Sequence, residues 1–194
     1  MSKTPKLEDR IQAHRNFHAR VSRRFPDGLC RSAGQVGAKV AVVGMKPERN
    51  ETIPFTGKLT GLAGQLLASL EVPDPLLLKT YLVRSPRAAR SPAVPWVEIL
   101  KEELEIVRPK AVILLGAELA RAVLNLPGEE IEHLRKTRFV FRKNAAMSWF
   151  VTFSPQDVDA GGGLQSPMGN YWTFDHSAVF ESVERYFATR ILES

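Results

Sequence analysis

Apolar residues in this chain follow two patterns, one typical of buried strands and the other of amphipathic helices. Short runs rich in valine, isoleucine and leucine, closed by glycine or polar residues, are typical of strands that are buried on both faces. Such runs predict strands at residues 39–44, 76–83, 110–116, 137–141 and 149–153.

Between those runs, apolar residues recur at helical spacing. The pattern predicts helices at about 7–24, 59–70, 95–107, 118–125 and 175–191, and the first of them has a strongly basic outer side. Strands that alternate with helices imply right-handed crossovers and a mainly parallel sheet. We therefore predict a single α/β domain over residues 1–194, with a three-layer αβα architecture.

In open parallel sheets the ligand crevice lies at the carboxyl ends of the strands. The loops that follow Val43, Val83 and Phe153 are therefore expected to line the functional site. The first strand is followed by neither a Gly-x-Gly-x-x-Gly motif nor a Walker lysine motif, so the sequence does not predict a dinucleotide or nucleoside triphosphate site.

The composition is that of a globular chain, with 44% hydrophobic and 25% charged residues among 194. No apolar run approaches the length that spans a bilayer, and the amino terminus lacks the apolar segment of a secretory signal. These features predict a cytoplasmic monomer with no membrane contact. A single cysteine, Cys30, excludes an internal disulfide bond.

The formal net charge of +6 favours an anionic partner such as nucleic acid. Arginines and lysines cluster in three parts of the chain. The first group is Arg10, Arg15, Arg20, Arg23, Arg24 and Arg31; the second is Arg84, Arg87 and Arg90; the third is Arg135, Lys136, Arg138, Arg142 and Lys143. Two interpretations remain open at this stage. The groups either converge on one face or form ordinary solvated surfaces.

Four ordered motifs lie at or near the predicted strand ends. They are Gly44-Met45-Lys46-Pro47, Pro54-Phe55-Thr56-Gly57, Ala63-Gly64-Gln65-Leu66-Leu67, and the run from Arg108-Pro109-Lys110 to Leu115-Gly116. Together they resemble the uracil-DNA glycosylase superfamily, particularly its bacterial family 4. The first motif also resembles that of the single-strand-selective monofunctional uracil glycosylases.

The resemblance implies hydrolysis of the N-glycosidic bond of a base that has been flipped out of the stack. Such a site needs a group that positions water and a donor that stabilises the departing base. The family's glutamate corresponds to Met45 here, and Lys46 follows it where the single-strand-selective enzymes have asparagine. Glu48, Asn50 or Glu51 could take over the role of the water-positioning group; alternatively, all three are ordinary solvent-exposed loop residues.

The base-binding positions also differ from the family pattern. Alignment places Thr80 at the asparagine that selects uracil, and Ser154-Pro155 at the family's His-Pro-Ser motif. Phe55 retains the aromatic that stacks on the flipped base, for which the competing interpretation is a core residue beneath the loop. The predicted catalytic residues are Lys46, Glu48, Asn50 and Ser154, and the predicted base-binding residues are Met45, Phe55 and Thr80.

The predicted DNA contacts are Arg84, Arg87 and Val158. The two arginines follow the second crevice strand, and Val158 lies near the position of the family's apolar wedge, although Asp157 and Asp159 flank it.

Family 4 enzymes hold an iron–sulfur cluster on four cysteines. The corresponding positions here are Ser22, Phe25, Arg84 and Leu100, and Cys30 lies outside the pattern. Because such a cluster needs thiolate ligands, we predict no cluster and no other cofactor. The histidines show no metal-ligand spacing, and His14 and His18 are predicted to lie on the surface of the first helix, so no metal site is predicted.

Two hypotheses from different classes follow. In the first, the chain is a divergent DNA glycosylase-like protein that binds a flipped or single-stranded base. If it is an active hydrolase, it excises a base other than uracil. In the second, the chain is a catalytically inactive nucleic-acid or nucleobase-binding module of the same fold. A third hypothesis assigns Lys46 a covalent attack on the sugar.

Overall fold

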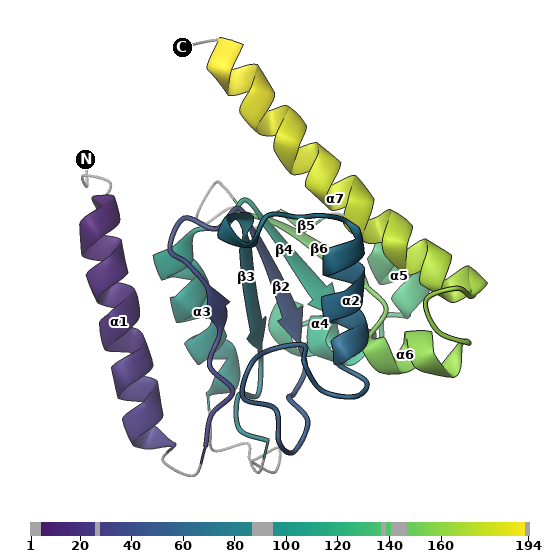
Figure 1. Cartoon of the computed structure of the whole chain (residues 1–194), viewed down its shortest axis with the longest axis horizontal. Coiled ribbons are helices and arrows are strands. Elements are labelled where there is room, and N and C mark those ends of the chain that lie inside the picture. Colours follow the sequence, from purple (N-terminus) through teal and green to yellow (C-terminus); the bar gives the residue numbers. More distant parts are fainter. Residues whose placement is uncertain (1–4, 26–27, 87–94, 137–138, 141–146, 193–194) are drawn as a thin grey trace.

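The computed structural model describes residues 5–25, 28–86, 95–136, 139–140 and 147–192. Within these residues the centre of the molecule is a six-stranded sheet in the order β1-β3-β2-β4-β6-β5 (Figure 1). The strands are β1 (Ala33–Gly34), β2 (Val40–Gly44), β3 (Leu77–Tyr81), β4 (Ala111–Leu115), β5 (Phe139–Val140) and β6 (Ser148–Thr152). The four inner strands are parallel and the two edge strands pair antiparallel to them.

Three helices cover one face of the sheet. They are α1 (Leu7–Arg24), α3 (Trp96–Val107) and α4 (Ala117–Leu124). Their apolar sides meet the sheet in a cluster that we call the α3-side core, where Phe17 and Leu104 are fully buried. The spacing of apolar residues in α3 and α4 accounts for this packing, because it places them along one side of each helix.

The opposite face is covered by α2 (Gly61–Ser69), α6 (Pro155–Ala160) and α7 (Pro167–Leu192). We call the cluster beneath them the α2-side core; Leu66 and Trp172 are its fully buried centre. Helices on both faces of a mainly parallel sheet confirm the predicted α/β fold class.

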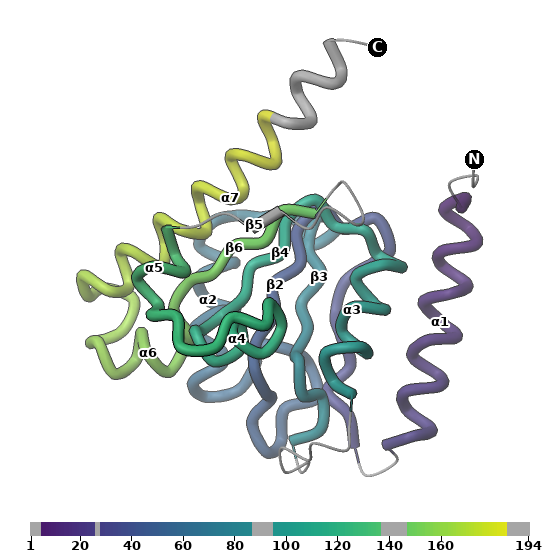
Figure 2. Tube along the Cα trace, turned by 180° about the vertical axis from the view of Figure 1, so that it is seen from behind, coloured from purple at the N-terminus to yellow at the C-terminus, as the bar shows by residue number. Residues whose placement is uncertain are grey.

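Two short elements complete the described structure. The 3-10 helix η1 (Asp74–Leu76) leads into β3, and α5 (Ile131–Lys136) lies beside β6 at the far edge of the sheet (Figure 2). In the described part of the chain, no helix combines the length and the apolar character that crossing a membrane would require.

The sequence pattern located the inner strands to within one or two residues but misjudged the last helix. The structure begins α7 at Pro167, eight residues before the predicted start at 175, and it adds α5 and α6. Ser166 explains the early start, because its hydroxyl oxygen accepts a hydrogen bond from the Gly169 N–H at 3.1 Å, as an N-cap does. Pro167 then occupies the first helical position, where its missing N–H costs nothing.

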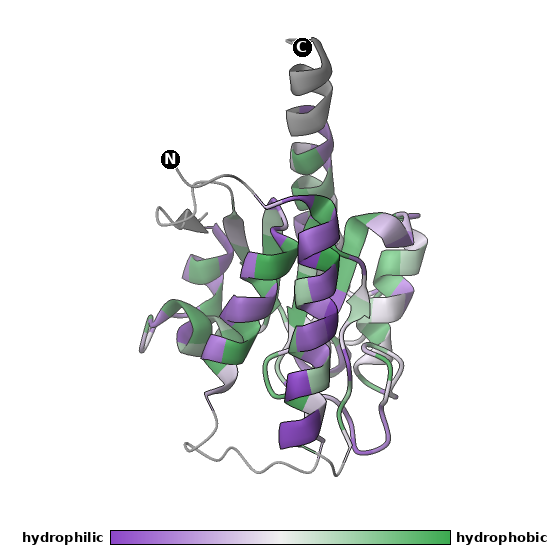
Figure 3. Cartoon of the chain, turned by 90° about the vertical axis from the view of Figure 1, so that its left-hand side faces the viewer, coloured by the Kyte–Doolittle hydropathy of each residue, from purple (hydrophilic) through white to green (hydrophobic). Residues whose placement is uncertain are grey.

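Described members of the first and third basic groups lie on separate helices. Arg15, Arg23 and Arg24 are exposed on α1, whose hydrophilic residues face the viewer in Figure 3. Arg135 and Lys136 belong to α5, which lies at the opposite edge of the sheet from α1 (Figures 1 and 2). Among the described residues, α1 and α5 therefore carry separate basic surfaces.

A fully buried histidine, His176, makes the packing of α7 sensitive to pH. Its Nδ1 lies 2.9 Å from the carbonyl oxygen of Trp172, and its Nε2 has no hydrogen-bond partner among the described residues. Burial lowers the pKa of His176 from 6.5 to about 4, although the Trp172 carbonyl and Asp175 favour the charged form. Burial likewise lowers the pKa of His18 to about 4.

We predict that the free energy of unfolding falls as the pH drops from about 6.5 to about 4. Both histidines have a lower pKa in the folded chain than in the unfolded chain, so the unfolded chain binds more protons across this window and the stability present above it is lost. His176→Leu should remove about 1–3 kcal/mol of this loss. Urea unfolding of the parent and of His176→Leu between pH 6.5 and pH 4 measures this difference. If the two proteins lose stability equally, His176 is not the source of the pH dependence.

Candidate functional site

The loop after β2, residues 45–60, is organised around the buried carboxylate of Glu51. Its Oε1 accepts hydrogen bonds from the Tyr81 hydroxyl at 2.7 Å and the Thr56 N–H at 3.0 Å. Its Oε2 accepts from the Glu48 N–H and the Thr60 hydroxyl, both at 2.9 Å. Four donors satisfy both oxygens, so Glu51 serves as the internal anchor of the loop.

Glu48 closes the same loop onto the start of α2. Its Oε1 accepts from the Leu59 N–H at 2.6 Å and the Thr60 N–H at 2.9 Å. Burial alone would raise the pKa of Glu48, but the backbone N–H groups of Thr60, Leu59 and Lys58 hold it below its usual value. The side chain therefore stays charged and caps the orphan amides at the helix start.

Phe55 lies at the tip of this arrangement, in the α2-side core. Its backbone has a φ of 66°, a left-handed value that is unusual for a residue with a side chain, and its N–H donates to the Tyr81 hydroxyl at 3.1 Å. The Phe55 and Tyr81 rings meet edge to face, with centroids 5.1 Å apart. Only 3% of Phe55 is exposed, so in this conformation the ring presents no free face to a base.

Glycines of the motifs make this packing possible. A Cβ at Gly44 would lie 2.5 Å from the Tyr81 ring and 3.0 Å from the Phe55 ring. A Cβ at Gly57 would lie 2.5 Å from Glu48 Oε1, and one at Gly64 would lie 2.5 Å from the Phe55 carbonyl oxygen. The matching motifs therefore specify the shape of the loop through close backbone approach.

Met45, Lys46 and Asn50 lie in the same loop but do not gather around Phe55. Met45 is partly buried against the α3-side core, which lies across the sheet from Phe55. Lys46 is half-buried just past the end of β2, and Asn50 is exposed in a turn. Of the residues that the sequence proposed, Glu48, Glu51 and Phe55 take part in the hydrogen bonds of this loop.

Thr80 faces the wrong way for the base-selecting role. Alternation along β3 directs Leu77 and Tyr81 to the α2-side core with Phe55, and Leu78 and Leu82 to the opposite face. Thr80 shares the face of Leu78 and Leu82, is fully buried, and its hydroxyl has no hydrogen-bond partner among the described residues. Tyr81 is the residue that sequence reasoning missed, because the two-residue period shows that it faces away from Thr80 but not which face meets α2.

Ser154 begins a helix. Its hydroxyl oxygen accepts from the Asp157 N–H at 3.1 Å, while its own N–H and hydroxyl both donate to Asp157 Oδ2. This capping box starts α6, and Pro155 follows at the first helical position. Val158, the predicted wedge, is completely buried in the α2-side core, so it does not reach DNA in this conformation.

Arg84, predicted as a DNA contact, is also buried. It is 1% exposed and forms an ion pair with Glu103 of α3, which is fully buried, while its guanidinium lies 5.2 Å from the Phe17 ring centroid. Desolvation on its own would raise the pKa of Glu103, but the charge of Arg84 and hydrogen bonds lower it to about 2. Arg87 lies outside the described residues.

His14, which is buried, and His18, which is half-buried, also contact Glu103, contrary to the prediction that both lie on the surface. The Nε2 atoms of His14 and His18 lie 3.3 and 3.7 Å from Glu103 Oε1, within a group of atoms that could in principle ligate a metal. Arg84 already supplies a cation to that carboxylate. A divalent ion would therefore add positive charge to a buried site with a single anion.

The four positions that the resemblance aligns with the cluster cysteines of family 4 carry no thiol. The chain has one cysteine, and the four corresponding positions carry Ser22 on α1, Phe25 stacked on Trp96, the ion-paired Arg84, and the buried Leu100. Apolar and ion-pair contacts occupy the α1–α3 interface, and these side chains do not fit an iron–sulfur cluster.

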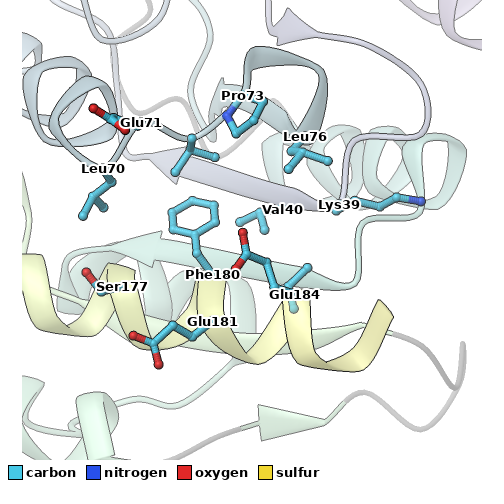
Figure 4. Close-up of a pocket in the computed structure, with 12 residues that line it drawn as sticks. Lys39, Val40, Leu70, Glu71, Pro73, Leu76, Ser177, Phe180, Glu181 and Glu184 are labelled. Atoms are coloured by element: carbon cyan, nitrogen blue, oxygen red, sulfur yellow. The ribbon is translucent and has the colours of Figure 1, made fainter. Parts of the chain in front are cut away.

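A separate cavity of about 200 Å³ opens at the amino end of the sheet (Figure 4). Val40, Leu76 and Phe180 line it, and the carboxylates of Glu181 and Glu184 stand at its side. Because it lies at the edge opposite the motif loops, this cavity is not the site that the motifs indicate.

Arg84→Ala should lower the free energy of unfolding by about 3–5 kcal/mol, because it leaves the buried Glu103 carboxylate without its cation. Urea unfolding provides the measurement. The matched control is Arg23→Ala, on the exposed side of α1, for which a change within about 0.5 kcal/mol is expected. A stable Arg84→Ala protein with selectively weakened DNA binding would restore the original interpretation.

Thr80→Val should leave nucleobase binding unchanged and raise stability by about 1 kcal/mol, since it replaces an unpaired buried hydroxyl with a methyl group of similar size. Thermal unfolding and base-binding titrations test the two parts. A loss of base selectivity in this variant would show that Thr80 reaches the site after all.

The comparisons with known proteins agree with the motifs. No curated protein matches the chain significantly. The family described as the Uracil DNA glycosylase superfamily matches residues 32–172, from just before β1 into α7, and so includes the whole sheet and the loop organised by Glu51. The chain therefore belongs to the uracil-DNA glycosylase superfamily.

Proposed function

We propose that this protein is a divergent DNA glycosylase-like protein that binds a flipped or single-stranded base at the carboxyl edge of its sheet. The proposal rests on membership of the superfamily and on the loop at that edge, which Glu51 and Tyr81 hold around Phe55. Since the Phe55 ring is covered, base stacking on it requires the loop to shift when a base enters.

The site chemistry argues against uracil as the preferred base. The position of the family's histidine donor is Ser154, whose hydroxyl is engaged with Asp157, and losing one such donor costs on the order of 10²–10³ in rate. The position aligned with the uracil-selecting asparagine is Thr80, which faces the α3-side core. We therefore propose that any excision acts on a base other than uracil.

A catalytically inactive base-binding module is the second candidate, and one observation favours it. The two carboxylates of the loop around Phe55, Glu48 and Glu51, accept hydrogen bonds from the loop backbone and the Thr60 hydroxyl. A carboxylate held in this way is a weaker acceptor for the proton of an attacking water. Under this alternative the protein binds a base without cleaving its N-glycosidic bond.

A substrate screen separates the two candidates. Purified protein is incubated with single-stranded oligonucleotides that carry uracil, hypoxanthine, xanthine or an alkylated base, and abasic sites are detected by alkaline cleavage. We expect little or no cleavage at uracil. Cleavage at another base supports the glycosylase, whereas base-dependent binding without abasic sites supports the inactive module; efficient uracil excision would contradict our account of Ser154 and Thr80.

Binding to single-stranded DNA should weaken steeply with salt, because contacts of lysine and arginine with phosphates release counterions. Fluorescence anisotropy at several salt concentrations measures the slope of log affinity against log salt. If no binding appears even at low salt, the nucleic-acid proposal fails and a free nucleobase or another small ligand becomes the candidate.

A further inference from the structure

Two aromatic side chains are exposed next to each other on α7, away from the loop that holds Phe55. Tyr171 is 58% exposed and Phe174 is 70% exposed, and both are among the few large apolar side chains that the described surface presents. A spacing of three residues places them on the same side of the helix. Exposure of two large rings at one place is costly unless something covers them.

The rings lie beside a cation whose position is fixed. The guanidinium of Arg135 makes two hydrogen bonds to Asp175, Nε to Oδ2 at 2.8 Å and Nη2 to Oδ1 at 3.0 Å. The Thr152 hydroxyl donates to the same carboxylate at 2.6 Å. This bidentate geometry holds the guanidinium rigidly at the end of β6.

Arg135, whose side chain is 14% exposed, packs between the exposed ring of Tyr171 and the buried ring of Phe153. Its Cζ lies 4.4 Å from the centroid of the Phe153 ring and 5.3 Å from that of Tyr171. The result is a series of flat groups that runs from Phe153 through Arg135 to Tyr171. Since Phe153 immediately precedes Ser154, this series begins at the carboxyl edge where we propose that the base is bound.

Two shallow depressions of about 580 and 620 Å³ lie on either side of Tyr171 and share Arg135, Lys136 and Tyr171. The one that reaches Phe174 is lined by two cations and one carboxylate, Asp175, which is already paired with Arg135, whereas the other depression adds the carboxylate of Glu132. In the depression that reaches Phe174, flat rings, a flat guanidinium and the second cation, Lys136, match an anionic strand with unstacked bases. They match an apolar protein partner less well, because the lining keeps both cations.

We propose that Tyr171, Phe174, Arg135 and Lys136 form a second base-stacking surface, which binds the single-stranded DNA flanking the base held at the sheet edge. This inference rests on the proposed function, since it assumes a nucleic-acid ligand. The rings stack on bases of any identity, Arg135 extends the stack, and Lys136 contacts phosphate.

The test is fluorescence anisotropy with a labelled oligothymidylate long enough to extend past the sheet edge. Tyr171→Ala with Phe174→Ala should weaken binding by roughly 10- to 100-fold, the effect of losing one or two base stacks. The slope of log affinity against log salt should stay the same, because no phosphate contact is removed. Lys136→Gln should instead reduce that slope by about 1.

Leu7→Ala is the matched control, because Leu7 is a 54% exposed apolar residue on α1, remote from this surface. It should bind like the parent protein. A 2-aminopurine placed beside the target position should lose fluorescence on binding to the parent, through stacking, and lose less on binding to the double variant. Circular dichroism and thermal unfolding confirm that each variant is folded.

The outcomes separate this inference from the proposed function. If the parent binds no oligonucleotide, the proposed function fails. If the parent binds and the double variant binds equally well with the same quenching, only the second surface is refuted. If the double variant instead changes the oligomeric state in light scattering while DNA affinity is unchanged, the rings belong to a protein contact and the inference is again refuted.

Discussion

The buried ion pair between Arg84 and Glu103 ties together three separate parts of this fold. Arg84 lies just beyond β3, Glu103 belongs to α3, and the carboxylate also contacts His14 of α1. A fully buried carboxylate is stable only when its charge and lone pairs are satisfied, so these partners have to remain in place together. The packing of α1 on the sheet, and with it the end of β3 at the carboxyl edge, depends on this contact.

A second carboxylate has the same role at the crevice. Glu51 fixes the loop after β2 through Tyr81, Thr56 and Thr60, and the left-handed backbone of Phe55 persists because the Tyr81 hydroxyl accepts its N–H. Backbone strain of this kind, of order 1–3 kcal/mol, survives only where the surroundings determine the conformation. The loop is therefore preorganised by its hydrogen bonds.

In this member of the superfamily, polar side chains near the expected base-binding site stabilise the fold. Glu48 caps α2, Ser154 caps α6, and Arg84 neutralises a buried carboxylate. Each group satisfies backbone amides or charge that would otherwise be unpaired. Under the function that we propose, recognition at this sheet edge depends on shape, stacking and phosphate contacts.

The sequence by itself determined the inner strands, α1 and the α/β class, because burial on both sides of a parallel strand and one apolar helix face leave strong periodic signals. It also determined the family, through ordered motifs whose glycines are needed for close packing at Gly44, Gly57 and Gly64. Only the tertiary structure decided which way Thr80 and Tyr81 face, because a two-residue period gives the alternation but not which face meets α2. It also decided that Arg84 is buried, since a charged residue enters a core only when a distant partner, here Glu103, is brought to it by the fold.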